Sequence, residues 1–175
     1  MSEQPGRYQR SAAGMVGAMV VLVLFVVAVV VLRGVLMEEP VNTVEPVDYR
    51  STAERVQDQA DFPLLAPASL PEGWRATSVG LTPDPTPRWH LGMLTDEDRY
   101  VGLEQARSSE RRMVERYVDS EAVPGEPVDV DGDTWRTWTD EGGDTALSRV
   151  EDGVTTVVVG TPGQDVLIDF VRTLR

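Results

Sequence analysis

The stretch "WRATSVGLTPDPTPRWHLGMLTDEDRYVGLEQA", residues 74–106, decides the fold. It contains three short runs of apolar and β-branched residues, which are separated by "TPDPTP" and "TDED". Proline-rich and acidic turn residues between such runs are typical of strand connections. The stretch therefore predicts three consecutive strands of an antiparallel meander. The preceding segment, residues 61–74, combines several prolines with large apolar residues, and we expect it to cross the core in an extended form.

The rest of the C-terminal region continues this grouping of strands and helices. The segment "SSERRMVERYV", residues 108–118, has apolar residues at helical spacing, and "AVPGEP" after it ends the helix. Four more strands are predicted at residues 127–130, 133–138, 145–151 and 154–160. Grouped strands with helices between them predict an α+β domain, with a mostly antiparallel sheet and two or three packing helices.

Two of these helices have recognisable start signals. Ser51 is the expected N-cap of a short first helix, and Glu54 completes its capping box. Thr161 is the expected N-cap of the last helix, with Pro162 at the first helical position and Gln164 completing the box. The apolar face of this last helix is expected to contain Leu167, Phe170, Val171 and Leu174.

One block near the N-terminus has the composition of a membrane span. Residues 12–32, "AAGMVGAMVVLVLFVVAVVVL", contain neither a charge nor a proline, and they have the length that a helix needs to cross the hydrocarbon core of a bilayer. A cleaved secretory signal has a shorter apolar region that ends at a small-residue cleavage site, and neither condition is met. We therefore expect one transmembrane helix at residues 12–32, preceding the α+β domain.

The charges on either side of this block predict its orientation. Arg7 and Arg10 precede it, whereas mainly acidic residues follow it, and arginines close to a span tend to stay in the cytoplasm. We expect a cytoplasmic head at residues 1–11, an extended acidic tether at residues 33–48 and an extracytoplasmic domain at residues 49–175. The expected location is the cell membrane, with the N-terminus cytoplasmic.

The composition excludes several classes of function. The chain has 16 basic and 29 acidic residues, a net charge of −13, and such a surface repels nucleic acid. It has no cysteine, so the exported domain must be held together by its core without disulfides. None of its basic residues is a lysine, which excludes Schiff-base chemistry.

Three aspartates at alternate positions raise the question of calcium binding. Asp129, Asp131 and Asp133 have the spacing of the first three ligands of an EF-hand loop. The glycine that this loop needs at its sixth position is missing, and Asp140 stands where a bidentate glutamate is expected. Asp131-Gly132 between two predicted strands is instead typical of a type I′ hairpin turn. The sequence favours the hairpin and leaves calcium as the alternative.

Two tryptophans follow this turn. Trp135 and Trp138 lie three residues apart, so on a strand they point to opposite faces of the sheet. We expect both to be buried, one on each face. The alternative is that one of them is exposed and forms a ligand platform together with Trp89 or Tyr100.

Catalytic chemistry has little support in the sequence. His90 is the only histidine, so any serine triad or imidazole zinc site would have to use it. No GxSxG, HExxH or cysteine cluster accompanies it, and we interpret it as a half-exposed strand residue. The many acidic residues make some carboxylate pair inevitable, which singles out none. The sequence therefore assigns no catalytic, cofactor-binding or metal-ligating residue and no cofactor.

Four segments carry a resemblance to a known family. They are "LPEGWRATSV" at 70–79, "WHLGMLTDEDRYVGLEQA" at 89–106, "VDGDTWRTW" at 130–138 and "TVVVGTPGQDVLIDFVRTL" at 156–174. In these segments and in its overall order, the chain resembles the bacterial, membrane-anchored family called domain of unknown function 4245. The resemblance implies a short cytoplasmic head, a single anchor and a small exported domain of unassigned activity, and it supplies no catalytic residues.

These observations lead to one expected function and two alternatives. We expect a single-pass membrane protein whose exported domain, not an enzyme, binds a protein partner or assembles in the cell envelope. Such a module should present a contiguous apolar or aromatic patch on the sheet and no enclosed pocket. A small-ligand or calcium-binding domain should instead have a concave site with one tryptophan and converging acids, and an envelope hydrolase should have a cleft with perturbed pKa values.

Overall fold

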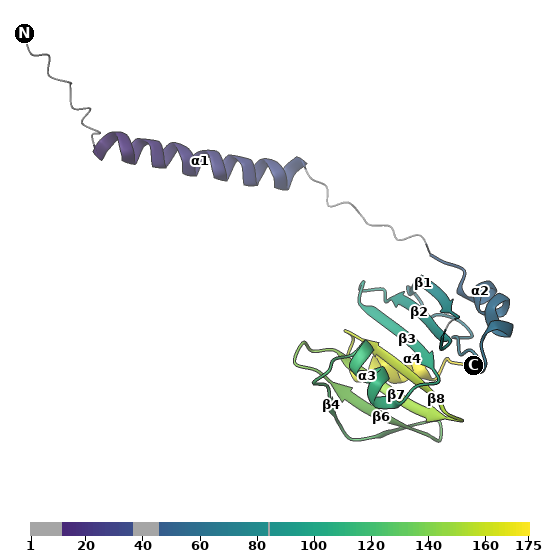
Figure 1. Cartoon of the computed structure of the whole chain (residues 1–175). Coiled ribbons are helices and arrows are strands. Elements are labelled where there is room, and N and C mark those ends of the chain that lie inside the picture. Colours follow the sequence, from purple (N-terminus) through teal and green to yellow (C-terminus); the bar gives the residue numbers. More distant parts are fainter. Residues whose placement is uncertain (1–11, 37–45, 84) are drawn as a thin grey trace, which may run out of the picture. The chain divides into compact units, whose positions relative to one another are not determined.

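An antiparallel sheet of eight strands organises the described residues of the C-terminal unit, Val44–Arg175 (Figure 1). The computed structural model describes residues 12–36, 46–83 and 85–175, so the expected head and most of the expected tether lie outside the described residues. Neighbouring strands follow the order β1-β2-β3-β8-β7-β6-β4, and β5 also pairs with β6. The strands are β1 Arg75–Thr82, β2 Arg88–Leu94, β3 Tyr100–Ala106, β4 Val123–Pro124, β5 Val128–Val130, β6 Asp133–Thr139, β7 Thr145–Glu151 and β8 Val154–Gly160. The predicted α+β class is confirmed, as are the meander and the four later strands.

The described residues contain four α-helices, two of which cover opposite faces of the sheet. The helices are α1 Ala12–Leu36, α2 Tyr49–Val56, α3 Glu110–Tyr117 and α4 Gln164–Val171, and a short 3-10 helix, Gln57–Gln59, follows α2. Met113 and Val114 of α3 pack against one face, and Leu167 and Phe170 of α4 pack against the other. We call these the α3 face and the α4 face. Figure 1 shows α3 in front of the sheet and α4 behind it.

The two tryptophans of β6 belong to the two separate cores. Trp135 is 3% exposed and packs on the α4 face, whereas Trp138 is 4% exposed and packs on the α3 face. The indole nitrogen of Trp138 donates a hydrogen bond to Ser148 Oγ at 2.7 Å, so its polar atom is also satisfied. The prediction that both are buried on opposite faces is confirmed. Neither one forms an exposed ligand platform.

The α4 face is covered further by the proline-rich segment before β1. Phe62 and Leu64 are buried and form a cluster with Trp89 and Val154. The indole nitrogen of Trp89 donates to the carbonyl oxygen of Leu65 at 2.9 Å, which fixes the segment to β2. The expected extended crossing of the core is confirmed, and it leaves this part of the α4 face closed to solvent.

The Asp131-Gly132 pair forms the predicted hairpin turn. Both residues have positive φ, 54° for Asp131 and 93° for Gly132, and Val130 pairs with Asp133 on either side of them. Positive φ at both central positions is the requirement of a type I′ turn, and Asp-Gly meets it at low cost. The turn therefore explains why a glycine stands at position 132, two residues before the position at which an EF-hand loop needs one.

The expected caps of α2 and α4 are wrong. The N-cap of α2 is Asp48, whose carboxylate accepts a hydrogen bond from the Ser51 amide at 3.1 Å, so the helix starts before Ser51. The N-cap of α4 is Gly163, because the Thr161 amide donates to the carbonyl oxygen of Tyr100 at 3.1 Å and thereby extends the sheet ladder. A competing hydrogen bond explains each difference.

We predict that Asp48→Ala measurably lowers the free energy of unfolding, because α2 loses the N-cap side chain that accepts the Ser51 amide. Glu54→Ala is the matched control, because Glu54 is exposed and the capping box expected for it is not formed. Urea unfolding of the two variants tests the assignment. A larger loss of unfolding free energy in Glu54→Ala than in Asp48→Ala would support the capping box of Ser51 and Glu54 and contradict the assignment of Asp48 as the N-cap.

The segment "AVPGEP" is more than the end of a helix. Val123 and Pro124 form β4, which pairs with Thr139 and Trp138 at the edge of the sheet. Proline is tolerated at such an edge, where the ladder hydrogen bond it cannot donate is not needed. This two-residue strand was missed because its proline argues against a strand in the sequence.

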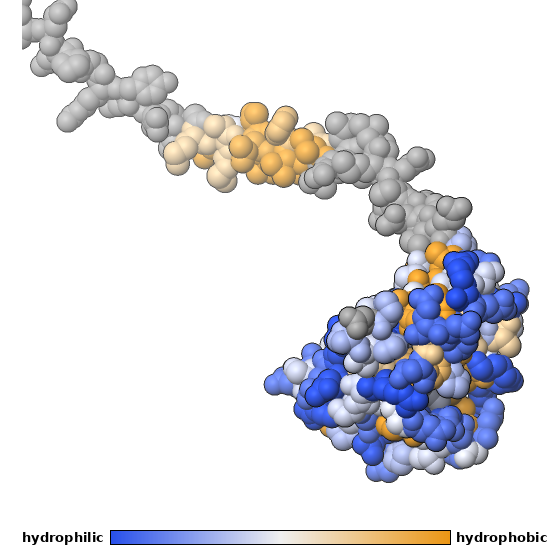
Figure 2. All heavy atoms as spheres, turned by 45° about the vertical axis from the view of Figure 1, so that its right-hand side comes forward, coloured by the Kyte–Doolittle hydropathy of each residue, from blue (hydrophilic) through white to orange (hydrophobic). Residues whose placement is uncertain are grey.

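The N-terminal apolar block is helical. Its large apolar side chains between Met15 and Val29 are exposed, and Figure 2 shows them as a hydrophobic surface. Among the residues whose side chains the structure describes, which in α1 run from Met15 to Val29, no helix is long and apolar enough to cross a membrane. The transmembrane role of residues 12–32 stays a prediction.

Candidate functional site

Part of the α3 face is not covered by α3. The helix packs over β7 and β8, where its apolar partners include Ala146, Val157 and Val159. On β1, β2 and β3 the same face contains small residues, among them Gly80, Gly92 and Gly102. Nothing lies within 4 Å of the Cβ position of Gly80, whereas Gly92 and Gly102 are buried beside the Tyr100 ring. We call this area, on β1 to β3, the open face.

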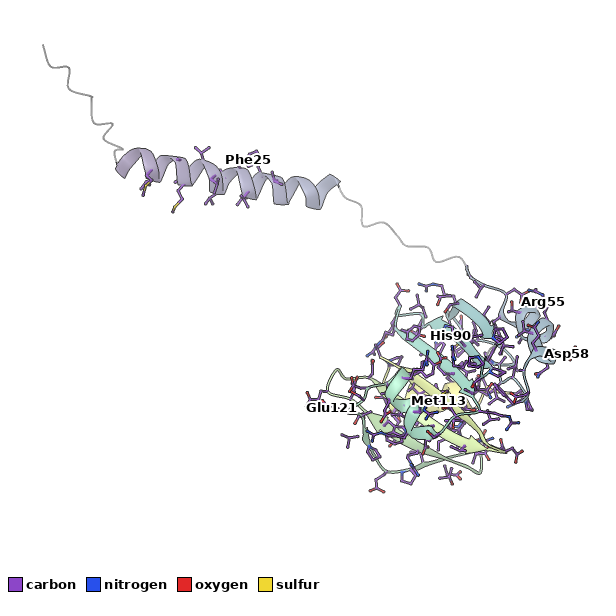
Figure 3. The ribbon with its side chains drawn as sticks, in the orientation of Figure 1. Phe25, Arg55, Asp58, His90, Met113 and Glu121 are labelled. Carbon is purple, nitrogen blue, oxygen red and sulfur yellow. The ribbon has the colours of Figure 1, made fainter. Side chains whose placement is uncertain are left out.

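A serine, a histidine and a glutamate form a hydrogen-bonded row across the open face. Ser78 Oγ lies 2.8 Å from His90 Nε2, and His90 Nδ1 lies 2.5 Å from Glu104 Oε1. The three residues come from β1, β2 and β3 in order. The histidine side chain is 37% exposed and the glutamate side chain is 4% exposed, so the row runs from the solvent into the protein. Figure 3 labels His90 on β2.

Strand register brings the three side chains together. His90 pairs with Glu104 across β2 and β3, and Ser78 pairs with Gly92, two residues beyond His90 on β2. Residues two apart on a strand share a face, so Ser78 and His90 are diagonal neighbours. Gly92 keeps the space between them free, since a Cβ there would clash with Ser78 Oγ.

Tyr100 closes one end of the open face. Its ring lies over Gly102, where an added Cβ would come within 2.8 Å of the tyrosine hydroxyl, and it also lies close to Gly92. Burial raises the pKa of Tyr100 to about 12, and the nearby charge of Glu104 contributes in the same direction. The phenol therefore stays protonated at neutral pH and keeps a hydroxyl donor beside the row.

The row has unusual electrostatics. The hydrogen bond to Glu104 raises the pKa of His90, and this effect exceeds the opposing effect of burial. Burial raises the pKa of Glu104, while His90 and, more weakly, Tyr117 and Arg116 oppose that rise. Tyr117 lies close by, but Glu104 Oε2 has no hydrogen-bond partner among the described residues. One oxygen of this carboxylate is therefore buried without a donor in hydrogen-bonding geometry.

This arrangement fixes the tautomer of the histidine. An ionised Glu104 accepts a hydrogen bond from Nδ1–H of His90. In the neutral imidazole Nε2 then carries no proton and can accept a hydrogen bond from the Ser78 hydroxyl. The imidazole can then take that proton from Ser78, and the glutamate stabilises the resulting imidazolium. The row can therefore polarise a serine hydroxyl or present a donor and acceptor pair to a ligand.

We predict that His90 titrates above its ordinary pKa of 6.5 and that Glu104→Gln brings the value below 6.5. In that variant the charged partner is lost, and burial, which lowers the histidine pKa, remains. Because His90 is the only histidine, its imidazole proton resonance is unambiguous in an NMR titration. A wild-type pKa at or below 6.5 would contradict the hydrogen-bonded pair.

The same shift links the row to stability. A histidine pKa that is higher in the folded state means that the native protein holds the proton more tightly. The stabilisation is complete below pH 6.5 and is lost as pH rises through the folded-state pKa. The raised pKa of Glu104 affects stability in the same direction. Its stabilising contribution is complete below pH 4.5, the ordinary pKa, and is lost as the pH rises through the folded-state pKa.

The three aspartates near the hairpin do not converge on a cation. Asp133 forms an ion pair with Arg149, and Asp131 lies 3.8 Å from Arg172. The Asp129 carboxylate accepts a hydrogen bond from the Gly132 amide. Within residues 46–83 and 85–175, no group of three or more potential ligands is placed to hold a metal ion. The carboxylates serve the turn and its ion pairs.

A hollow beside this hairpin has part of the composition expected for a small-ligand site. It has a volume of about 150 Å³ and is lined by Trp135, Asp131 and Asp133 together with arginines. Arg149 lies over the Trp135 ring, 5.5 Å from its centroid, and also pairs with Asp133. The charges in this hollow are thus already compensated by one another.

Sequence reasoning reached only one member of the Ser78, His90 and Glu104 row. The sequence singles out His90 as the one imidazole and predicts a half-exposed strand residue, which its place on β2 and its 37% exposed side chain confirm. Ser78 and Glu104 lie 12 and 14 residues away from it, and no local motif connects them. The available signal was the meander itself, because three consecutive antiparallel strands place such positions side by side.

Comparison with known proteins gives a family but no activity. The family model described as "Protein of unknown function (DUF4245)" matches residues 7–174, nearly the whole chain. The comparison with curated proteins finds no match.

Proposed function

The chain belongs to the DUF4245 family, whose function is not assigned, and we propose that it is a single-pass membrane protein whose exported domain binds a partner in the cell envelope. The α1 helix is the observation that carries this proposal. Its described side chains are exposed on all sides, and a helix that is hydrophobic all round is stable only in apolar surroundings. Residues 12–32 contain no charge, and a bilayer supplies such surroundings.

The open face supports the binding role. The α4 face is covered by α4 and the proline-rich segment, whereas the open face presents His90 and Ser78 above glycines. We propose that the partner contacts this area.

Site-directed crosslinking tests the binding role in intact cells. Gly80→Cys places a thiol on β1, at the edge of the open face beside His90, where nothing lies within 4 Å of the Cβ position, and the chain has no other cysteine. Asp58→Cys is the control, because Asp58 is exposed on the short helix after α2 (Figure 3). A photo-crosslinker attached to each thiol should give a discrete adduct from position 80 and none from position 58. Equal adducts from both, or none from position 80, would contradict the proposal.

A second candidate function is hydrolysis of an ester or similar acyl bond. The hydrogen-bonded row of Ser78, His90 and Glu104 specifically favours it, because it has the connectivity of a nucleophile, a base and an orienting acid. Ser78 lies inside β1 and not on the sharp strand-to-helix turn that exposes the nucleophile of α/β-hydrolases. For this reason the binding role comes first.

Covalent labelling separates the two functions. A fluorophosphonate probe should label the wild-type chain at Ser78 if the row activates the hydroxyl, and Ser78→Ala and His90→Gln should both lose the label. Thr77→Ala is a control, because Thr77 is the neighbouring hydroxyl and bonds to the carbonyl oxygen of Gly92. An unlabelled wild-type chain excludes the hydrolase and leaves the binding role intact.

A further inference from the structure

A small hollow between α3 and the ends of β2 and β3 is lined by arginines. It has a volume of about 130 Å³, and Arg88, Arg107, Arg112 and Arg116 contribute to its wall. Arg88 comes from β2, Arg107 directly follows β3, and the other two lie one turn apart on α3. Four arginines therefore line one hollow in a chain whose net charge is −13.

Three of these arginines form no ion pair with a described residue. None of the ion pairs in the described part of the chain includes Arg88, Arg112 or Arg116. Arg107 differs, because it pairs with Asp61 at 3.1 Å and donates to the carbonyl oxygen of Asp152 at 2.8 Å. Arg107 thus forms a fixed wall. Arg116 lies over the Tyr117 ring, 5.7 Å from its centroid, and its charge also acts on the buried Glu104, but neither contact is an ion pair.

This grouping is unfavourable without an anion. Arg112 and Arg116 are four residues apart on α3, where like charges repel each other, and Arg88 adds a third positive charge. The neighbouring Arg111 shows the usual arrangement on this helix, since it pairs with Glu115 at 2.5 Å. A bound anion would remove the repulsion among the three unpaired arginines.

The lining of the hollow indicates which anion fits. Its apolar side consists of Ala106 and Met113, both buried, and its polar side includes Thr86 and Ser108. Guanidinium groups bind carboxylate and phosphate through paired N–H donors. Donors that come from both a strand and a helix approach from different directions, which suits the tetrahedral arrangement of oxygens in a phosphoryl group better than a planar carboxylate.

We infer that this hollow binds a phosphoryl group through Arg88, Arg112 and Arg116. The volume of about 130 Å³ is well below the roughly 300–1,000 Å³ of pockets that enclose drug-sized ligands, so only the phosphoryl group enters and the rest of the ligand lies outside. The site shares no residue with the Ser78, His90 and Glu104 row, although the charge of Arg116 acts on Glu104, and it does not depend on the proposed partner. The bound phosphoryl group belongs either to a soluble phosphate monoester or to the phosphodiester of a lipid headgroup or envelope polymer.

The test is a calorimetric titration of the full chain in non-ionic detergent with inorganic phosphate, at constant ionic strength set by chloride. The double variant Arg88→Gln and Arg116→Gln should bind phosphate at least about tenfold more weakly, because two charge-assisted hydrogen-bonding groups are lost. Arg111→Gln is the matched control on the same helix and should bind like the wild type. Equal affinity in the double variant, or no binding by the wild type, would overturn the inference.

Two further titrations identify the source. Glycerol phosphate represents a monoester, which carries about −1.5 to −2 charge at pH 7, and glycerophosphoglycerol represents the phosphodiester of a lipid headgroup. Tighter binding of the monoester assigns a soluble ligand, and tighter binding of the diester assigns a headgroup or polymer. Either order of affinity supports the site if the double variant no longer discriminates between the two ligands. Retention of the ranking in the double variant would contradict it.

Discussion

Replacing Trp89 with alanine is expected to lower the free energy of unfolding by about 3–5 kcal/mol, the usual cost of removing a large buried aromatic side chain. Trp89 is fully buried, and it joins three parts of the C-terminal unit. Its ring packs with Phe62 of the proline-rich segment and Val154 of β8, and its indole nitrogen donates to the Leu65 carbonyl. The substitution leaves a cavity and an unsatisfied carbonyl oxygen at the same place.

Trp89→Phe is the matched variant for this prediction. It keeps most of the apolar volume and loses the hydrogen bond, so its cost should be clearly smaller than that of the alanine variant. Urea unfolding of the full chain in detergent, followed by tryptophan fluorescence and circular dichroism, measures both. If Trp89→Ala cost less than about 1 kcal/mol, Trp89 would not be the link between the segment and the sheet.

The second large effect is expected in α1. The double variant Leu22→Arg and Val26→Arg places two charges at the centre of the proposed span, and each should cost about 2.5–3.5 kcal/mol on membrane insertion. The double variant should therefore leave the membrane fraction. Its control, Leu22→Ile and Val26→Ile, keeps the helix apolar and should remain there.

Fractionation after an alkaline wash measures this effect. The wash removes peripheral proteins, so a wild-type chain held by α1 should stay with the membranes. If the arginine variant stayed there as firmly as the isoleucine variant, α1 would not be the element that holds the chain.

The sequence predicted the fold well because most of its signals are local. Turn residues such as Asp131-Gly132 marked the strand ends, and the spacing of Trp135 and Trp138 placed them on opposite faces. Both patterns depend on neighbouring residues, so no knowledge of the tertiary structure was needed. The pairing of β3 with β8, which completes the sheet, depends on contacts between distant segments.

The caps and the candidate site depended on contacts that no local pattern contains. Thr161 has the sequence of an N-cap, but its amide completes the ladder with Tyr100 and the helix begins later. Ser78 and Glu104 are ordinary strand residues until the register places them beside His90. The arginine hollow likewise needs α3 packed against the sheet before its charges converge.

Thiol accessibility tests the central claim, a membrane anchor with the C-terminal domain outside the cytoplasm. The chain has no cysteine, so Glu121→Cys, on the exposed turn after α3, and Ser2→Cys, near the N-terminus, each give a single reactive thiol (Figure 3). With a membrane-impermeant maleimide, Glu121→Cys should be labelled in intact cells and Ser2→Cys only after lysis. Labelling of Glu121→Cys only after lysis would contradict the account.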